Sequence, residues 1–130
     1  MAALSDHAEN LLLNFLMTTG TATRPTNWYL ALFTAAPSDT GGGTECSGNG
    51  YSRQTVAWDA ASGSGGTTSN SGTVTFTASG GNFGNVTHIG IFDASTSGNL
   101  LWHGAMAAAK QVNSGDSIQF ATGSIDLTIA

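Results

Sequence analysis

The segment VTHIGIFDASTSGNLLWHG, residues 86–104, constrains the fold more than any other part of the chain. It holds two short apolar runs, Val86–Phe92 and Leu100–His103, separated by a polar stretch that contains Gly98. Two such runs around a turn predict a β-hairpin. β-Branched and aromatic side chains favour a well-covered sheet surface, so we expect this hairpin near the centre of a sheet and not at its edge.

Short apolar or alternating segments continue this pattern along the chain, which predicts roughly seven to nine strands. That number is typical of an all-β antiparallel sandwich or jelly-roll-like domain. At 130 residues the chain has the size of one domain, so we expect a single domain over residues 1–130 with the β-sandwich at 27–130. The expected strands after the turn at residues 21–27 are Trp28–Thr34, Tyr51–Trp58, Gly72–Ala78, the hairpin with its continuation at 105–112, Ser117–Thr122 and Ser124–Ala130.

One N-terminal amphipathic helix is expected at residues 5–18, where Ser5 or Asp6 can cap the first free amides. Its apolar stripe could cover the open end of the sandwich, which we prefer, or contact a neighbouring subunit. The second alternative makes Leu11 and Phe15 candidate partner contacts. The stripe follows helical spacing through Ala8, Leu11, Leu12, Phe15 and Leu16, and Leu13 and Met17 widen it.

Charged residues make up only 8% of the chain, against roughly 25% in a typical soluble domain. A net charge of −5 with three basic residues leaves little to bind phosphates or an anionic membrane, so we expect no nucleic-acid partner. No apolar run is long enough for membrane insertion, and the N-terminus lacks the basic residues of a signal peptide. Because few charges protect the sheet edges, we expect neighbouring subunits to cover them.

The side chains that could take part in catalysis or metal binding do not form a recognisable catalytic or metal-binding motif. Asp39-Thr40-Gly41 matches the short motif of aspartic proteases, but Ala36, Pro37 and Ser38 precede it where that family has an apolar strand, so a loop is favoured. No serine stands in a nucleophile-elbow context, and the glycine-rich stretch at 41–50 has no phosphate-binding lysine. A lone Cys46 allows neither an intrachain disulfide nor a metal-binding cysteine pair. We therefore expect a non-enzyme with no catalytic residue, cofactor or metal.

His88 and His103 lie on the two arms of the predicted hairpin. One strand register places them on the same face of the sheet, and a shift by one residue places them on opposite faces. A metal would need more ligands than these two, and Asp93 is the only carboxylate close in sequence. Histidines bonded to backbone or hydroxyl groups are favoured, and a row of histidines around a symmetry axis is the other alternative.

Aromatic residues on a β-sandwich can also form stacking platforms for sugars. Core packing accounts better for Trp28 and Trp102, whereas Trp58 and Phe83 lie beside or within turns and are candidate glycan contacts. The long loop Ala35–Gly50, which includes Asp39, is a further candidate contact surface.

Three segments resemble a family of small tailed-bacteriophage virion structural proteins, usually labelled phage tail-fibre-like proteins. They are LSDHAENLLLNFL, LFTAAPSDTGGGTE and GIFDASTSGNLLWHG, and the similarity runs from Leu4 to about Asp116. The resemblance implies a virion component made in the host bacterial cytoplasm without a signal peptide, and a homotrimer. Its implied partners are the major capsid protein or tail proteins, with a host surface glycan as a further candidate.

Three functions follow as alternatives. A compact chain without fibrous repeats or coiled-coil heptads favours a capsid decoration or cement protein on the outer shell. A tail-fibre or receptor-binding tip component is the runner-up, and a free carbohydrate-binding β-sandwich module is the alternative from a different class. In the first case the contact with the shell would come from the N-terminal segment or from the loop Ala35–Gly50.

Overall fold

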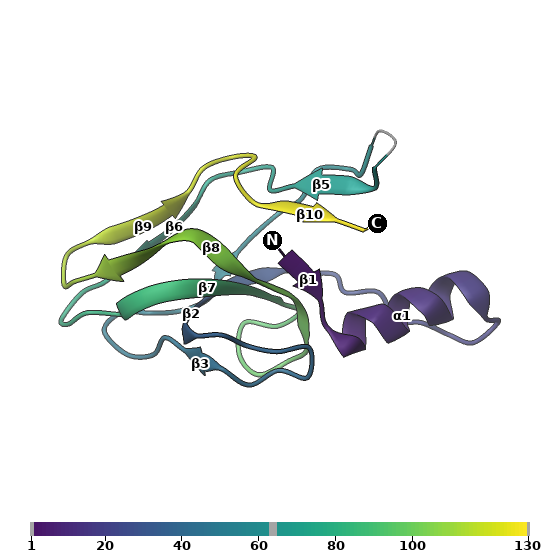
Figure 1. Ribbon diagram of the computed structural model, residues 1–130, viewed down its shortest axis with the longest axis horizontal. Helices are drawn as coiled ribbons and strands as arrows, with labels where there is room; N and C mark the ends of the chain where they lie inside the picture. Colours follow the sequence, from purple (N-terminus) through teal and green to yellow (C-terminus); the bar gives the residue numbers. More distant parts are fainter. Residues whose placement is uncertain (1, 63–64, 130) are drawn as a thin grey trace.

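The computed structural model describes residues 2–62 and 65–129 as an antiparallel β-sandwich with one helix near the N-terminus (Figure 1). A larger sheet with strand order β1-β8-β7-β2-β3, in which β4 also pairs with β2, forms one layer. The pairs β6-β9 and β10-β5 form the other. The elements are β1 (Ala2–Leu4), α1 (Asp6–Met17), β2 (Tyr29–Ala35), β3 (Thr44–Glu45), β4 (Gln54–Thr55), β5 (Thr67–Ser69), β6 (Val74–Thr77), β7 (Gly84–Phe92), β8 (Leu100–Val112), β9 (Ser117–Phe120) and β10 (Asp126–Thr128).

The predicted central hairpin is confirmed as β7 and β8, and β7 lies between β8 and β2 in the larger sheet. Ile91 is opposite Trp102 on β8 and opposite Leu30 on β2. Gly90 allows this close packing, because a Cβ atom there would lie only 2.8 Å from the Phe33 ring. The hairpin therefore has the central place that its apolar composition predicts.

The core lies between the two layers. Leu30, Leu32 and Ile91 enter it from the larger sheet, and Val74 and Phe76 enter it from β6. The threonines that alternate with Val74 and Phe76 are exposed, as the alternation in sequence predicts. Ile118, Ile125 and Leu127 complete this layer, so one cluster of buried side chains includes residues from β2 to β10.

Three segments after the helix differ from the expected strands. Residues 51–58 form a strand only at Gln54–Thr55, because Tyr51 and Arg53 both turn their side chains inward to polar partners. The loop Ala35–Gly50 contains β3, and the tract that precedes the Gly72–Ala78 strand contains β5. These strands of two or three residues are too short to show alternation in the sequence.

The N-terminal helix is confirmed at Asp6–Met17, with Ser5 as its N-cap. The expectation that its apolar stripe covers the sandwich is wrong, because Ala8 is the only buried residue of α1. Phe15 is 67% exposed and Leu16 is 69% exposed. In Figure 1 the helix extends away from the sheets, so its last turn lies outside the sandwich. Neither α1 nor any other described segment is helical and apolar over the length that a bilayer crossing needs.

Candidate functional site

The first turn of α1 is fixed to the sandwich by Ser5, which is buried. Its backbone N–H donates a hydrogen bond of 2.9 Å to the Leu101 carbonyl, and its hydroxyl donates one of 2.5 Å to the Leu100 carbonyl. The same hydroxyl oxygen accepts the Ala8 N–H at 3.1 Å, which caps the helix. The buried Ser5 therefore holds the start of α1 against β8.

Asp39 joins this anchor from the loop between β2 and β3. Its carbonyl accepts the Asp6 N–H at 3.0 Å, and its carboxylate lies 2.7 Å from Nε2 of His103 on β8. Because Asp39 contacts a histidine and not a second aspartate, the geometry favours the loop interpretation over the protease motif. Asp39 thus joins the start of α1 to β8.

His88 and His103 lie on the same face of the sheet, since His88 is opposite Ala105 and His103 is opposite Gly90. They have separate partners: Nδ1 of His88 lies 2.8 Å from the Thr87 hydroxyl, while His103 contacts Asp39. The carboxylate of Asp93 accepts hydrogen bonds from Asn99. Within residues 2–62 and 65–129, no three His, Cys, Asp or Glu side chains are grouped as metal ligands would be.

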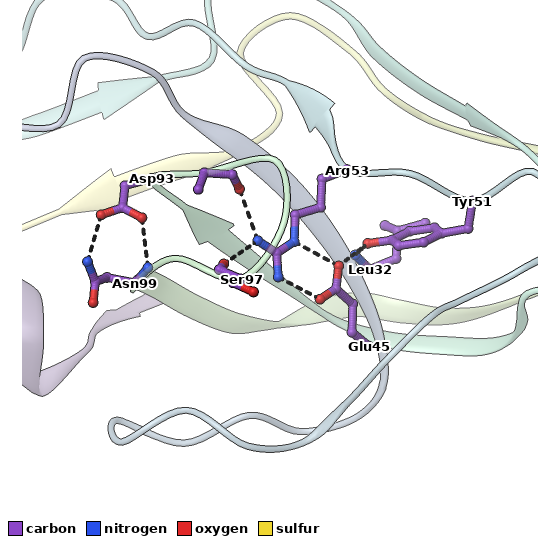
Figure 2. A network of polar contacts seen from close by, with 8 residues as sticks. Leu32, Glu45, Tyr51, Arg53, Asp93, Ser97 and Asn99 are labelled. Carbon is purple, nitrogen blue, oxygen red and sulfur yellow. Dashed lines mark hydrogen bonds and ion pairs between the residues drawn. The ribbon is translucent and has the colours of Figure 1, made fainter.

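Figure 2 shows a network of polar contacts centred on Arg53. The guanidinium donates two hydrogen bonds to the Glu45 carboxylate, 2.9 Å from Nε and 2.8 Å from Nη2. Nη1 donates to the carbonyls of Ala94 and Ser97 in the turn between β7 and β8. The guanidinium carbon also lies 3.6 Å from the centre of the Phe92 ring. Arg53 therefore holds the central hairpin's turn against the segment after β3.

Tyr51 extends this network toward the core. Its hydroxyl donates a 2.7 Å hydrogen bond to Glu45 and accepts the Leu32 N–H at 3.1 Å. Burial raises the pKa of the Tyr51 hydroxyl, and the hydrogen bond to Glu45 raises it further. Burial also acts to raise the pKa of Glu45, but hydrogen bonds from Arg53 and Tyr51 outweigh it and hold that pKa below its ordinary 4.5. Glu45 is therefore ionised at neutral pH.

We expect acid to destabilise the fold through Glu45. The pKa of Glu45 is lower in the folded than in the unfolded chain. The stability that ionised Glu45 contributes to the fold is therefore complete above about pH 4.5, and it is lost as the pH falls through the lowered pKa. The melting temperature of the Glu45→Gln variant, measured between pH 7 and pH 3, should fall less than that of the wild-type protein. Equal falls for the two proteins would contradict this role of Glu45.

The two candidate glycan residues have different positions. Phe83 is 6% exposed and its ring meets Tyr51 edge to face at 5.6 Å, so it belongs to the core. It offers no ring face to a sugar. Trp58 is half-buried and packs against the same core. Phe83 was a candidate because it lies in a turn of the sequence, and the position of Tyr51 that buries it is not visible in the local sequence.

The two candidate partner residues lie on α1 but differ in exposure. Leu11 is half-buried beside the turn at residues 21–25, where it lines a shallow hollow with Asn14 and Pro25. Phe15 is exposed together with Leu13, Leu16 and Met17. At 100° per residue, Leu13 and Met17 lie nearly opposite Phe15 around the helix, whereas Phe15 and Leu16 both belong to the helical stripe. We call Phe15 and Leu16 the α1 apolar face. The sequence had predicted an apolar surface here, but its exposure depends on the direction of the helix.

The fold and these contacts define a small β-sandwich protein, in which polar clusters hold loops and a helix presents apolar side chains. Residues 3–128 match the model of a protein family described as Podophage GP4 fiber I protein gp80. The chain belongs to this family, and it is a phage structural protein. The match confirms the resemblance to phage tail-fibre-like proteins. No curated protein matches the chain.

Proposed function

We propose that the chain is a non-enzymatic structural subunit of a phage fibre, held in the virion by contacts between proteins. The observation that carries this proposal is the α1 apolar face, where Phe15 is 67% exposed and Leu16 is 69% exposed. Exposed apolar side chains gathered in one place favour an interaction surface. The family description names a fibre protein, which favours the fibre over other positions in the virion.

The side chains that could carry chemistry support a role without catalysis. Arg53 and Glu45 bind each other, and Asp39 contacts His103. Burial raises the pKa of the Cys46 thiol to about 11, and the charge of Glu45 adds to this shift, so the thiol stays protonated at neutral pH. Each of these groups therefore serves the fold and is not poised as a nucleophile or a base.

Capsid decoration is the second candidate. It is favoured by the short elements of the described residues, in which the longest strand is β8 with 13 residues, because a fibre gains its reach from length. In that role the partner would be the major capsid protein, whereas a fibre subunit would contact tail proteins. Binding of a host surface glycan loses support because Phe83 lies in the core. Both virion roles place synthesis in the host bacterial cytoplasm.

The copy number of the chain in purified virions tests the proposal. Quantitative mass spectrometry should use two internal standards, the major capsid protein and a protein of the tail. We expect a few copies of the chain for each copy of the tail protein. We also expect far fewer copies of the chain than of the major capsid protein. A number comparable to that of the capsid protein would contradict the fibre role and support decoration. Absence of the chain from virions would contradict both roles.

A further inference from the structure

A second apolar surface that the described residues leave uncovered lies between β8 and the strands β9 and β10, next to Ala2 of β1. It is a groove of about 800 Å³. Ile118 and Ile125 are buried at its floor, and Met106 and Phe120 are half-buried. Its wall on β8 is made mostly of small side chains, with Met106 and Lys110 as the exceptions. We call this surface the β8 groove; its lining includes Met106, Ala107, Ala108, Ile118, Phe120 and Ile125.

The groove exists because β8 loses its partners along this stretch. β1 pairs with β8 only over Trp102–Gly104, so the β8 edge beyond Gly104 has no partner in β1. On the other side, the pairing with β7 shifts between Ala105 and Lys110, which face His88 and Val86. Four residues of β8 therefore stand opposite one residue of β7, and such a bulge bends a strand away from its neighbour.

The β8 groove and the α1 apolar face fit each other in size. Residues 10–17 form the later turns of α1 and extend about 12 Å at 1.5 Å per residue. The groove side of β8 from Gly104 to Lys110 extends at most about 20 Å at 3.3 Å per residue. Small side chains such as Ala107 and Ala108 allow close approach of a helix, and Phe15 and Leu16 are the bulky residues that could occupy the hollow.

Charge favours one orientation of the helix in the groove. α1 has no basic residue in its last turn, so the partial negative charge of its C-terminal end is not compensated within the helix. Lys110 lines the groove near the start of β9, where its ammonium group donates to the Ser117 carbonyl. Asp126 lines the groove with Ala2, near the other end, and would repel the acidic first turn of α1. The later turns, which carry no charge, are therefore the part that fits.

The helix cannot reach the groove of its own chain. Ser5 fixes the first turn to the carbonyls of Leu100 and Leu101, and α1 extends from there away from the sandwich (Figure 1). We propose that the α1 apolar face of one copy binds the β8 groove of a second copy, head to tail. This inference rests on the proposed structural role and names its partner surface. Such a contact closes into the expected homotrimer when successive copies are related by a three-fold rotation.

The test uses two variants that each remove one half of the contact. Phe15→Gln with Leu16→Gln makes the helix face polar and keeps residues with good helix propensity. Ala108→Glu places a carboxylate in the apolar groove. Measured by sedimentation velocity on the full chain, the wild-type protein should associate and each variant alone should be a monomer. An equimolar mixture of the two variants should form a heterodimer, because one variant keeps the groove and the other keeps the helix face.

Matched controls separate this contact from general effects of the substitutions. Asn10→Gln with Asn14→Gln changes exposed positions of the same helix, and Ala57→Glu adds a carboxylate at an exposed site outside the groove. Both controls should associate as the wild-type protein does.

Two results would overturn the inference. If the Ala108→Glu variant associates like the wild-type protein, the helices meet each other or another surface. If the wild-type protein is a monomer at every concentration tested, a second copy is not the partner of α1. The virion copy number is measured independently, so a monomer present in few copies per particle would leave the fibre role standing.

Discussion

Replacement of Arg53 by methionine is expected to lower the free energy of unfolding by about 3 kcal/mol. The Arg53 side chain is 8% exposed and makes two hydrogen bonds to Glu45, so its removal leaves a partly buried carboxylate without its cation. The carbonyls of Ala94 and Ser97 lose their donor at the same time. Urea unfolding at pH 7, where Glu45 is ionised, measures the loss.

The double variant Arg53→Met with Glu45→Gln is the control for this expectation. It removes the uncompensated charge but keeps an oxygen that can accept from the Tyr51 hydroxyl, so its loss of stability should be smaller than that of Arg53→Met alone. A single variant within about 0.5 kcal/mol of the wild-type protein would show that the ion pair does not stabilise the fold.

Replacement of Phe76 by alanine should have an effect of similar or greater size, about 3–5 kcal/mol. Phe76 is 2% exposed and lies between two other aromatic rings, stacked on Tyr51 at 6.0 Å and edge to face with Phe120 at 6.3 Å. Its removal leaves a cavity where the two layers meet. The measurement is again the free energy of unfolding in urea.

The same substitution at Phe15 provides the comparison, because that ring is mostly exposed. Phe15→Ala should change the stability of the monomer by less than about 0.5 kcal/mol. Dilute protein should be used, so that dissociation of copies does not contribute. Equal losses at the two positions would contradict the assignment of Phe76 to the core and of Phe15 to the surface.

Together, these expectations separate residues that hold the sandwich from residues that are free to bind. Arg53 and Phe76 act within one chain, whereas Phe15 and Ala108 belong to the proposed contact between copies. A substitution of the first kind should change stability at any concentration. One of the second kind should change association and leave the isolated sandwich intact.

Much of the secondary structure could be predicted from local pattern. The helix at Asp6–Met17 follows from a capping serine and a stripe at helical spacing, and the β7–β8 hairpin follows from two apolar runs around a polar turn. The alternation around Val74 and Phe76 correctly predicts which side chains of β6 are buried. These features depend on residues close together in the chain, so the sequence shows them directly.

The candidate site could be predicted only in part. Leu11 and Phe15 were chosen from the helical stripe, but the spacing that selects both cannot tell that one is half-buried and the other exposed. The β8 groove is lined by residues of β1, β7, β8, β9 and the segment that leads into β10, and none of these segments by itself indicates a hollow. Asp39 was chosen because it lies in the long loop Ala35–Gly50, and its contact with His103 spans 64 positions of the chain.

By itself, the sequence determined the all-β class, the central hairpin, the N-terminal helix and the membership of a phage structural family. These features depend on periodicity and on motifs formed by residues close together in the chain. Only the tertiary structure decided which apolar surfaces stay uncovered and which polar groups meet. The packing of Phe83 under Tyr51, the ion pair of Arg53 with Glu45 and the direction of α1 from Ser5 all depend on contacts between distant segments. Strand register and the packing of the two layers bring those segments together, and both are cooperative properties of the whole chain.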